Sequence, residues 1–226
     1  VTILQDINIL GFAFLNKFHS IIPFVKTLNA VNIIPESIMS QKTVKEYAPH
    51  PENNFFKGGV SMLEKTMVGP VAVFRTGRSM GDYVPYHVHT FLLGDVLIDT
   101  SCAWVRSELL MALEQESVAK IINTHHHEDH TGNNRAVQAK FGADIYAHPD
   151  ALPFLENPQN LKLLPYQLMV WDYPEPSQGI PLKKQFQAGE YTLEVIHTPG
   201  HCPAHVCFYE PQQKWLFAGD TFCGRG

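Results

Sequence analysis

Four histidines and an acidic pair occupy six consecutive positions of this chain, from His125 to His130. The segment follows a short apolar run at Ile121-Ile122 and precedes Thr131-Gly132-Asn133-Asn134, so we expect a loop between a buried strand and a helix. Imidazole nitrogens and carboxylates suit divalent first-row metals such as zinc, and a short loop can aim alternate side chains at one point. The chain is therefore expected to fold around a metal site.

One loop cannot enclose an ion, so further ligands are expected at the ends of other strands. Thr198-Pro199-Gly200-His201 follows a strand predicted for residues 191–197, and Gly219-Asp220 follows a strand predicted for residues 215–218. Each segment places a ligand directly after a β-run, as the histidine-rich loop does. The pattern predicts that these three strand ends meet at one edge of a sheet.

After Met67 the chain alternates short β-rich runs with helices. Strands at both ends with helices between them favour an α/β domain in which helices cover packed sheets. The remaining predicted strands are residues 71–74, 87–93, 96–98, 121–122, 144–146 and 205–209, and the predicted helices are residues 105–114 and 135–141.

Residues 1–66 are predicted to form an N-terminal extension, ahead of a main domain at residues 67–226. Apolar side chains recur at three- and four-residue steps from Ile7 to Ile21, which predicts an amphipathic helix that packs on the domain or on a partner. Its polar face carries few basic residues for membrane contact, and polar residues interrupt any membrane-spanning run. A polar stretch rich in proline, residues 35–59, is predicted to be a loop-rich connection.

Composition restricts the class of partner. The net charge is −5, from 17 Lys and Arg against 22 Asp and Glu, so the chain lacks the basic field that binds nucleic acid. A small-molecule substrate is expected instead. Four cysteines without a paired C-x-x-C spacing indicate reduced thiols, and together with the lack of a recognisable secretory signal they favour a cytoplasmic location.

Taken together and in this order, the motifs resemble those of the metallo-β-lactamase superfamily, and within it the glyoxalase II-like hydrolases. The resemblance runs from about Met67 to the C-terminus. It implies an αββα sandwich with the metals at one edge, and we expect this chain to lack the C-terminal part of that fold. The motifs are the strand Asp95-Val96-Leu97-Ile98-Asp99-Thr100, the H-x-H-x-D-H spacing of residues 125–130, the turn at residues 198–201, and Leu216-Phe217-Ala218-Gly219-Asp220.

The resemblance also implies two divalent ions, with zinc as the first expectation and iron or manganese as alternatives. His126 and Glu128 occupy variable positions, where they are expected to support the ligands or face solvent, and Asp99 is expected to organise the ligand loop by accepting hydrogen bonds. The implied ligands are His125, His127 and His201 for the first ion, and Asp129, His130 and Asp220 for the second, with Asp220 bridging.

One departure from the family concerns the second ion. The family brings a last histidine to it from a strand beyond the position of Asp220, whereas this chain ends at Gly226. Three alternatives stay open: a fragment of a longer protein, a second site without that ligand, or an unusual residue such as His19 or His50 in its place.

The function implied is that of a binuclear metallohydrolase. A metal-bound hydroxide, oriented by Asp129, would attack a small-molecule ester, thioester, lactone or lactam. One alternative is a mononuclear iron persulfide dioxygenase that uses two histidines and an aspartate of the same scaffold. Another is a metal-binding module without catalysis.

Overall fold

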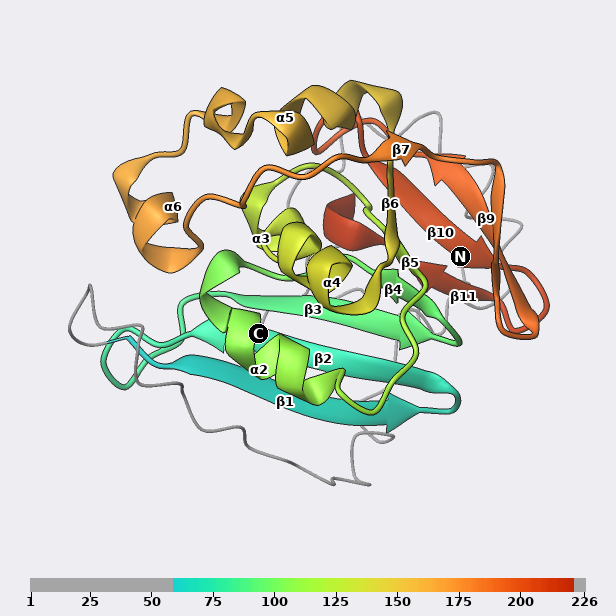
Figure 1. Cartoon of the computed structure of the whole chain (residues 1–226), viewed down its shortest axis with the longest axis horizontal. Helices are drawn as coiled ribbons and strands as arrows, with labels where there is room; N and C mark the ends of the chain where they lie inside the picture. Colours follow the sequence, from blue (N-terminus) through green and yellow to red (C-terminus); the bar gives the residue numbers. More distant parts are fainter. Residues whose placement is uncertain (1–58, 222–226) are drawn as a thin grey trace, which may run out of the picture.

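The computed structural model describes residues 59–221, which form two β-sheets packed face to face (Figure 1). The larger sheet has seven strands in chain order, antiparallel from β1 to β4 and parallel from β4 to β7, and the smaller has the order β11-β10-β9-β8. The strands are β1 (Ser61–Val68), β2 (Val71–Arg78), β3 (His87–Leu93), β4 (Val96–Ile98), β5 (Lys120–Ile122), β6 (Asp144–Ala147), β7 (Ile180–Pro181), β8 (Gln185–Ala188), β9 (Tyr191–His197), β10 (Val206–Glu210) and β11 (Trp215–Phe217).

Helices cover the face of the larger sheet that points away from the smaller one. Leu109 of α2 and Val137 of α4 share a core with Leu97 and Ile121 of the central strands. Within the described residues this helix–sheet–sheet arrangement supplies three of the four layers of the expected αββα sandwich (Figure 1). The helices are α2 (Arg106–Ala112), α3 (Glu128–Thr131), α4 (Asn134–Phe141), α5 (Leu152–Glu156) and α6 (Pro165–Val170), with short 3-10 turns at Ala103–Val105, Pro149–Ala151, Pro158–Leu161 and Gly219–Thr221.

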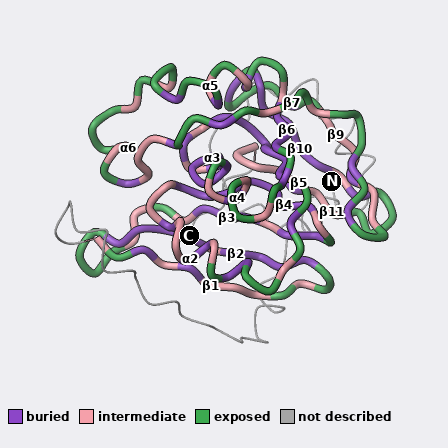
Figure 2. The backbone as a smooth tube through the Cα atoms, viewed as in Figure 1, coloured by how far each residue is buried: buried purple, intermediate pink, exposed green. Residues whose placement is uncertain are grey.

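The central strands are buried, as the purple segments of Figure 2 show, and their side chains enter two separate cores. In β4, Leu97 points into the core beneath the helices, whereas Val96 and Ile98 point into the core between the sheets. Ile121 and Ile122 of β5 divide between the same two cores. Successive side chains of a strand point to opposite faces, so a strand covered on both sides has an unbroken apolar run. This explains why these strands were recognisable in the sequence.

Most of the expected elements are confirmed with bounds that shift by no more than two residues. β2 runs four residues further than expected, and β1, β7, β8, α5 and α6 were not expected. β1 begins at Ser61 and pairs with β2 along its whole length, so the larger sheet starts ahead of the boundary drawn at residue 67. The helix expected near the N-terminus, and all but the last residue of the loop-rich connection, lie outside the described residues.

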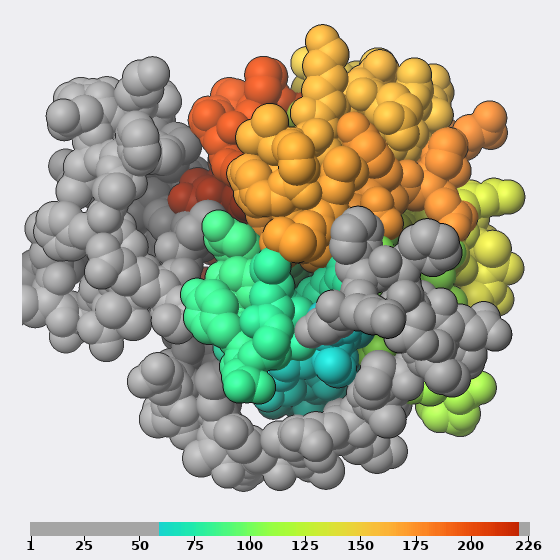
Figure 3. Space-filling model, turned by 90° about the vertical axis from the view of Figure 1, so that its left-hand side faces the viewer, coloured from blue at the N-terminus to red at the C-terminus, as the bar shows by residue number. Residues whose placement is uncertain are grey.

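The C-terminal end of α6 lies beside the loop that follows β2. Arg78 donates a hydrogen bond to the carbonyl oxygen of Met169 at 2.7 Å, and the rings of Tyr86 and Trp171 lie 5.1 Å apart. Figure 3 shows the same neighbourhood from outside, where the orange surface meets the green one. Within residues 59–221, no helix has the length and apolar character needed to cross a membrane.

The junction between α3 and α4 packs directly on the backbone that follows β4. A Cβ atom on Gly132 would lie 2.4 Å from the amide nitrogen of Ala103, and the amide of Gly132 donates to the carbonyl oxygen of Ser101 at 2.8 Å. The side-chain amide of Asn133 donates to the carbonyl oxygens of Thr100 and Cys102 at 2.8 and 2.7 Å. The histidine-rich segment is thereby fixed against the end of β4.

This close contact predicts a large loss of stability for Gly132→Ala. The added methyl group would meet backbone atoms that have no flexible end to move, and such overpacking costs about 1–3 kcal/mol. Gly200→Ala is the matched control, because nothing lies within 4 Å of its added Cβ. Urea unfolding should show the loss for Gly132→Ala alone, and equal unfolding free energies for the two variants would contradict the packing described.

Candidate metal centre

Segments from both sheets meet at one edge of the molecule. The chain leaves β5 through Thr124 and enters α3, and the amide of Val206 at the start of β10 donates to the carbonyl oxygen of Thr124 at 2.8 Å. The turn after β9 carries His201, and the 3-10 turn after β11 carries Asp220. The loop after β5 is shorter than expected, because residues 128–131 form the single-turn helix α3.

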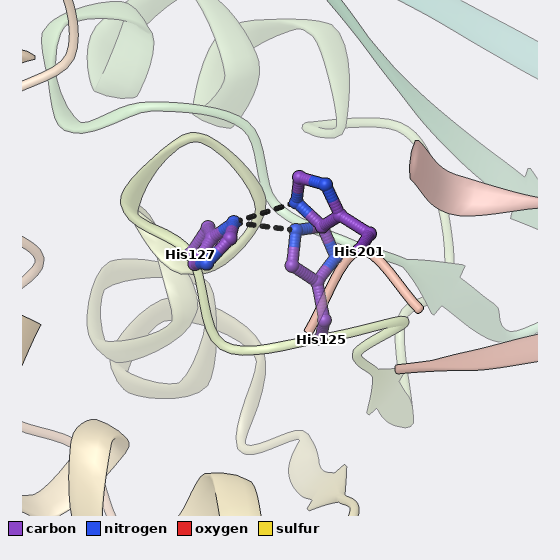
Figure 4. Close-up of side chains that lie close together, drawn as sticks. All are labelled: His125, His127 and His201. Carbon is purple, nitrogen blue, oxygen red and sulfur yellow. Dashed lines mark hydrogen bonds between the residues drawn. The ribbon is translucent and has the colours of Figure 1, made fainter. Parts of the chain in front are cut away.

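Three histidines from these segments point toward one another (Figure 4). Nδ1 of His127 lies 3.1 Å from Nε2 of His125 and 2.8 Å from Nε2 of His201. Each of the three side chains offers a ligand atom within 4.8 Å of the others. We call His125, His127 and His201 the histidine group.

Two of these rings are neutral at pH 7. Burial, followed by the neighbouring imidazoles, lowers the pKa of His125 well below its usual range, and the same causes lower the pKa of His127 to about 3. A neutral imidazole keeps a lone pair on one ring nitrogen, which is the form that binds a metal. The histidine group therefore fits a divalent ion.

Thr124 fixes which nitrogen of His125 is free. Its hydroxyl donates to Oδ2 of Asp99 at 2.7 Å, so its oxygen accepts from Nδ1 of His125 at 3.0 Å. Nε2 of His125 is then the lone-pair atom, and it faces His127. This role of Thr124 was not predicted, although the sequence places a hydroxyl residue between the buried strand and the first histidine.

A second group forms around the buried His130. Nε2 of His130 lies 3.1 Å from Oδ1 of Asp220 and 3.7 Å from Oδ2 of Asp129, and Nδ1 lies 2.8 Å from Oδ2 of Asp99. Burial alone lowers the pKa of His130, but the carboxylates of Asp129 and Asp99 raise it well above its usual range. Negative charge therefore exceeds positive charge here, which favours a cation. We call His125, His130 and Asp220, whose ligand atoms lie within 4.8 Å of one another, the carboxylate group.

The histidine group and the carboxylate group have His125 in common, and Asp220 faces both groups. Its Oδ1 approaches His130 and its Oδ2 lies 3.5 Å from Nε2 of His201. Burial raises the pKa of Asp220, but the hydrogen bond and charge of His130 outweigh it and lower the pKa to about 2. Asp129 lies beside the groups and belongs to neither by distance, and burial raises its pKa.

His205 holds the turn that presents Asp220. Nε2 of His205 accepts a hydrogen bond from the amide of Asp220 at 3.2 Å, and its Nδ1 lies 2.8 Å from the hydroxyl of Thr198. Gly219 has a φ of +48°, and a Cβ there would lie 2.8 Å from Nε2 of His205. Glycine is therefore required at this position.

The alternative that His126 and Glu128 face solvent is wrong. His126 is buried, and its ring stacks on Phe154 with 4.1 Å between centroids. Glu128 is buried as well and accepts a hydrogen bond from Nε2 of Gln167 at 2.8 Å, while burial raises its pKa to about 7. Both side chains pack under α5 and α6 because those helices, which were not expected, cover this part of the loop. His19 and His50 lie outside the described residues.

Comparison with known proteins gives a family match. A model described as "Metallo-beta-lactamase superfamily" matches residues 84–226. The "Hydroxyacylglutathione hydrolase" of Pelagibacter ubique is 29% identical over 146 residues, covering 61% of this chain and 52% of that protein. The protein of the same name from Maricaulis maris is 32% identical over 113 residues, covering 48% and 37%. The chain thus spans about half, or less, of the length of these relatives.

Solved structures support the same architecture. The BLEG-1 B3 metallo-beta-lactamase is 25% identical with a TM-score of 0.51, covering 73% of this chain and 76% of that one. A metallo-beta-lactamase family protein from Thermus thermophilus is 22% identical with a TM-score of 0.53, covering 69% and 60%. The latter likeness is one of fold.

We predict that His127→Ala greatly weakens metal binding. The ring contributes directly to the histidine group, so zinc affinity should fall by more than the roughly 10–100-fold typical of losing an outer hydrogen-bond partner. His197→Ala is the control, because this exposed histidine stacks on His148 and belongs to none of the ligand groups. Unchanged zinc content in His127→Ala, measured on purified protein, would contradict the assignment.

Asp99→Asn should weaken zinc binding by about 10–100-fold without removing a ligand. Oδ2 of Asp99 lies within hydrogen-bond distance of both the Thr124 hydroxyl and Nδ1 of His130, and an amide nitrogen in its place cannot accept from either. Asp95→Asn is the control, since Asp95 lies in the turn before β4 and forms an ion pair with Lys120 instead. Competition with a chromophoric chelator measures the affinity, and equal values for the two variants would refute the role of Asp99.

Proposed function

Because this chain belongs to the metallo-beta-lactamase superfamily, we propose that it is a binuclear metal-dependent hydrolase that cleaves a small-molecule thioester or ester. The proposed ligands of the first ion are His125, His127 and His201. Those of the second are Asp129, His130 and Asp220, with Asp220 between the two ions. The proposal rests mainly on the position of Asp220, which directs one carboxylate oxygen toward His130 and the other toward His201.

Zinc is the proposed metal, with iron or manganese as alternatives. The donor set of imidazoles and carboxylates suits each of these ions. When bound, a pair of such ions activates water and polarises the attacked carbonyl. The neutral rings of His125 and His127 and the excess negative charge around His130 support two positively charged occupants at this edge.

Asp129 is proposed to handle the proton of the attacking water. Its carboxylate is close to His130 yet lies outside the distance-defined groups, and part of its side chain is accessible. We assign it to accept a hydrogen bond from the water and take its proton as the new C–O bond forms. The proton then passes to the departing sulfur or oxygen as its bond to the acyl carbon breaks.

The names of the relatives support one substrate class. Those reported above are named hydroxyacylglutathione hydrolases, which supports a thioester ahead of a lactone or lactam. A cytoplasmic site of action is proposed with it, supported by the free thiols of Cys102, Cys202 and Cys207.

Zinc-loaded protein should hydrolyse thioesters equally well under air and under nitrogen. Asp129→Asn should lower kcat by about 10²–10⁴-fold, the usual contribution of a positioned acid–base group. Asp150→Asn is the control, because this side chain is largely exposed and lies away from the ligand groups. The assay set contains thioesters, esters, lactones, a chromogenic β-lactam and glutathione persulfide.

Two results would overturn the proposal. Oxygen-dependent turnover of the persulfide alone by iron-loaded protein, without hydrolysis of any ester or amide, would assign the chain to dioxygenase chemistry. Full activity of Asp129→Asn would remove the proposed role of that carboxylate.

A further inference from the structure

A third group of ligand atoms shares one member with the proposed hydrolytic centre. His126, His127 and Cys202 each offer a ligand atom, and these atoms lie within 4.8 Å of one another. The two histidines follow β5, and Cys202 follows His201 in the turn after β9. We call this set the thiol group. The proposed hydrolytic ligands include neither His126 nor Cys202.

One buried nitrogen of His126 lacks a hydrogen-bond partner in the described part of the chain. The residue is 8% exposed, and its buried Nδ1 has no hydrogen-bond partner among the described residues. Stacking on Phe154, with 16° between the planes, fixes the ring. A buried polar atom without a partner destabilises the fold, and a bound ion would relieve that cost.

Cys202 gives the thiol group a different metal preference from that of the hydrolytic groups. It is 7% exposed, and its backbone is fixed because its carbonyl oxygen accepts from the amide of His205 at 3.3 Å. A thiolate with imidazoles selects soft ions such as Cd²⁺, Cu⁺ and Zn²⁺, whereas the hydrolytic groups offer only nitrogen and oxygen. The thiol group therefore differs in chemistry from its neighbours.

We propose that the thiol group binds a soft metal ion and that this binding inhibits the enzyme. A neutral imidazole has one lone-pair nitrogen, so His127 serves one ion at a time. Nδ1 of His127 faces His125 and His201, and an ion held by His126 and Cys202 draws the ring away from that role. The binding site stands on geometry alone, whereas the inhibition rests on the proposed hydrolytic function.

The test adds Cd²⁺ to the zinc-loaded full chain and follows two signals. The first is the thiolate-to-cadmium charge-transfer absorption in the ultraviolet, and the second is the rate of thioester hydrolysis. We expect the absorption to saturate at one equivalent while the rate falls in parallel. Cys202→Ser should lose both effects, and Cys102→Ser should keep both, because Cys102 is a buried thiol that belongs to none of the ligand groups.

A second variant guards against a change in folding. His126→Phe keeps an aromatic ring against Phe154 but removes both nitrogens, so cadmium affinity should fall about 10-fold or more while zinc-dependent hydrolysis is retained. Unchanged cadmium affinity in this variant would overturn the assignment of His126.

The remaining outcomes separate the two proposals. Absorption that persists in Cys202→Ser overturns the thiol group, and equal cadmium inhibition of Cys202→Ser and the unsubstituted chain overturns the inhibitory role. If the chain hydrolyses no substrate, the proposed function fails, and the charge-transfer signal still decides whether the thiol group binds metal.

Discussion

One buried carboxylate organises the edge at which the two sheets meet. Asp99 accepts hydrogen bonds from the amide and hydroxyl of Thr124 at 2.8 and 2.7 Å, and its Oδ2 lies 2.8 Å from Nδ1 of His130. Its own backbone has a φ of +59°, a conformation that costs a residue other than glycine about 1–3 kcal/mol. Hydrogen bonds to an ionised group are strong enough to offset that strain. The ligand loop is thus positioned from the end of β4, and both metal groups depend on it.

The histidine group and the surroundings of His130 differ in their electrostatics. Burial keeps His125 and His127 neutral, so that half presents lone pairs. The other half surrounds His130 with the carboxylates of Asp99, Asp129 and Asp220, so it favours positive charge. A proton or a metal ion satisfies this second half, whereas the neutral imidazoles of the first half offer lone pairs that a metal ion can use. Neutral donors beside an acidic pocket suit positively charged metal ions.

The sequence predicted the elements that a covered strand or a dense motif makes visible. β4 and β5 were recognisable because both of their faces are apolar, and five of the six predicted ligand side chains lie in the two groups because each follows a strand end. β1 was missed because the charged residues Glu64 and Lys65 lie in the middle of the strand, where each forms an ion pair. β8 was missed because its four residues are too few to show a clear alternation of apolar and polar side chains.

Contacts between distant segments were beyond the reach of the sequence. That Asp99 accepts hydrogen bonds from the predicted ligand loop was expected, but the contact from Asp99 through Thr124 to His125 depends on side-chain rotamers that the sequence does not specify. The approach of Cys202 to His126 depends on how the turn after β9 packs on the loop after β5, and no local pattern reports that. His125, His127 and His130 come from the larger sheet, whereas His201 and Asp220 come from the smaller one. Any ion shared by these residues therefore ties the sheets together, and an ion that binds the folded chain more tightly than the unfolded chain raises the free energy of unfolding.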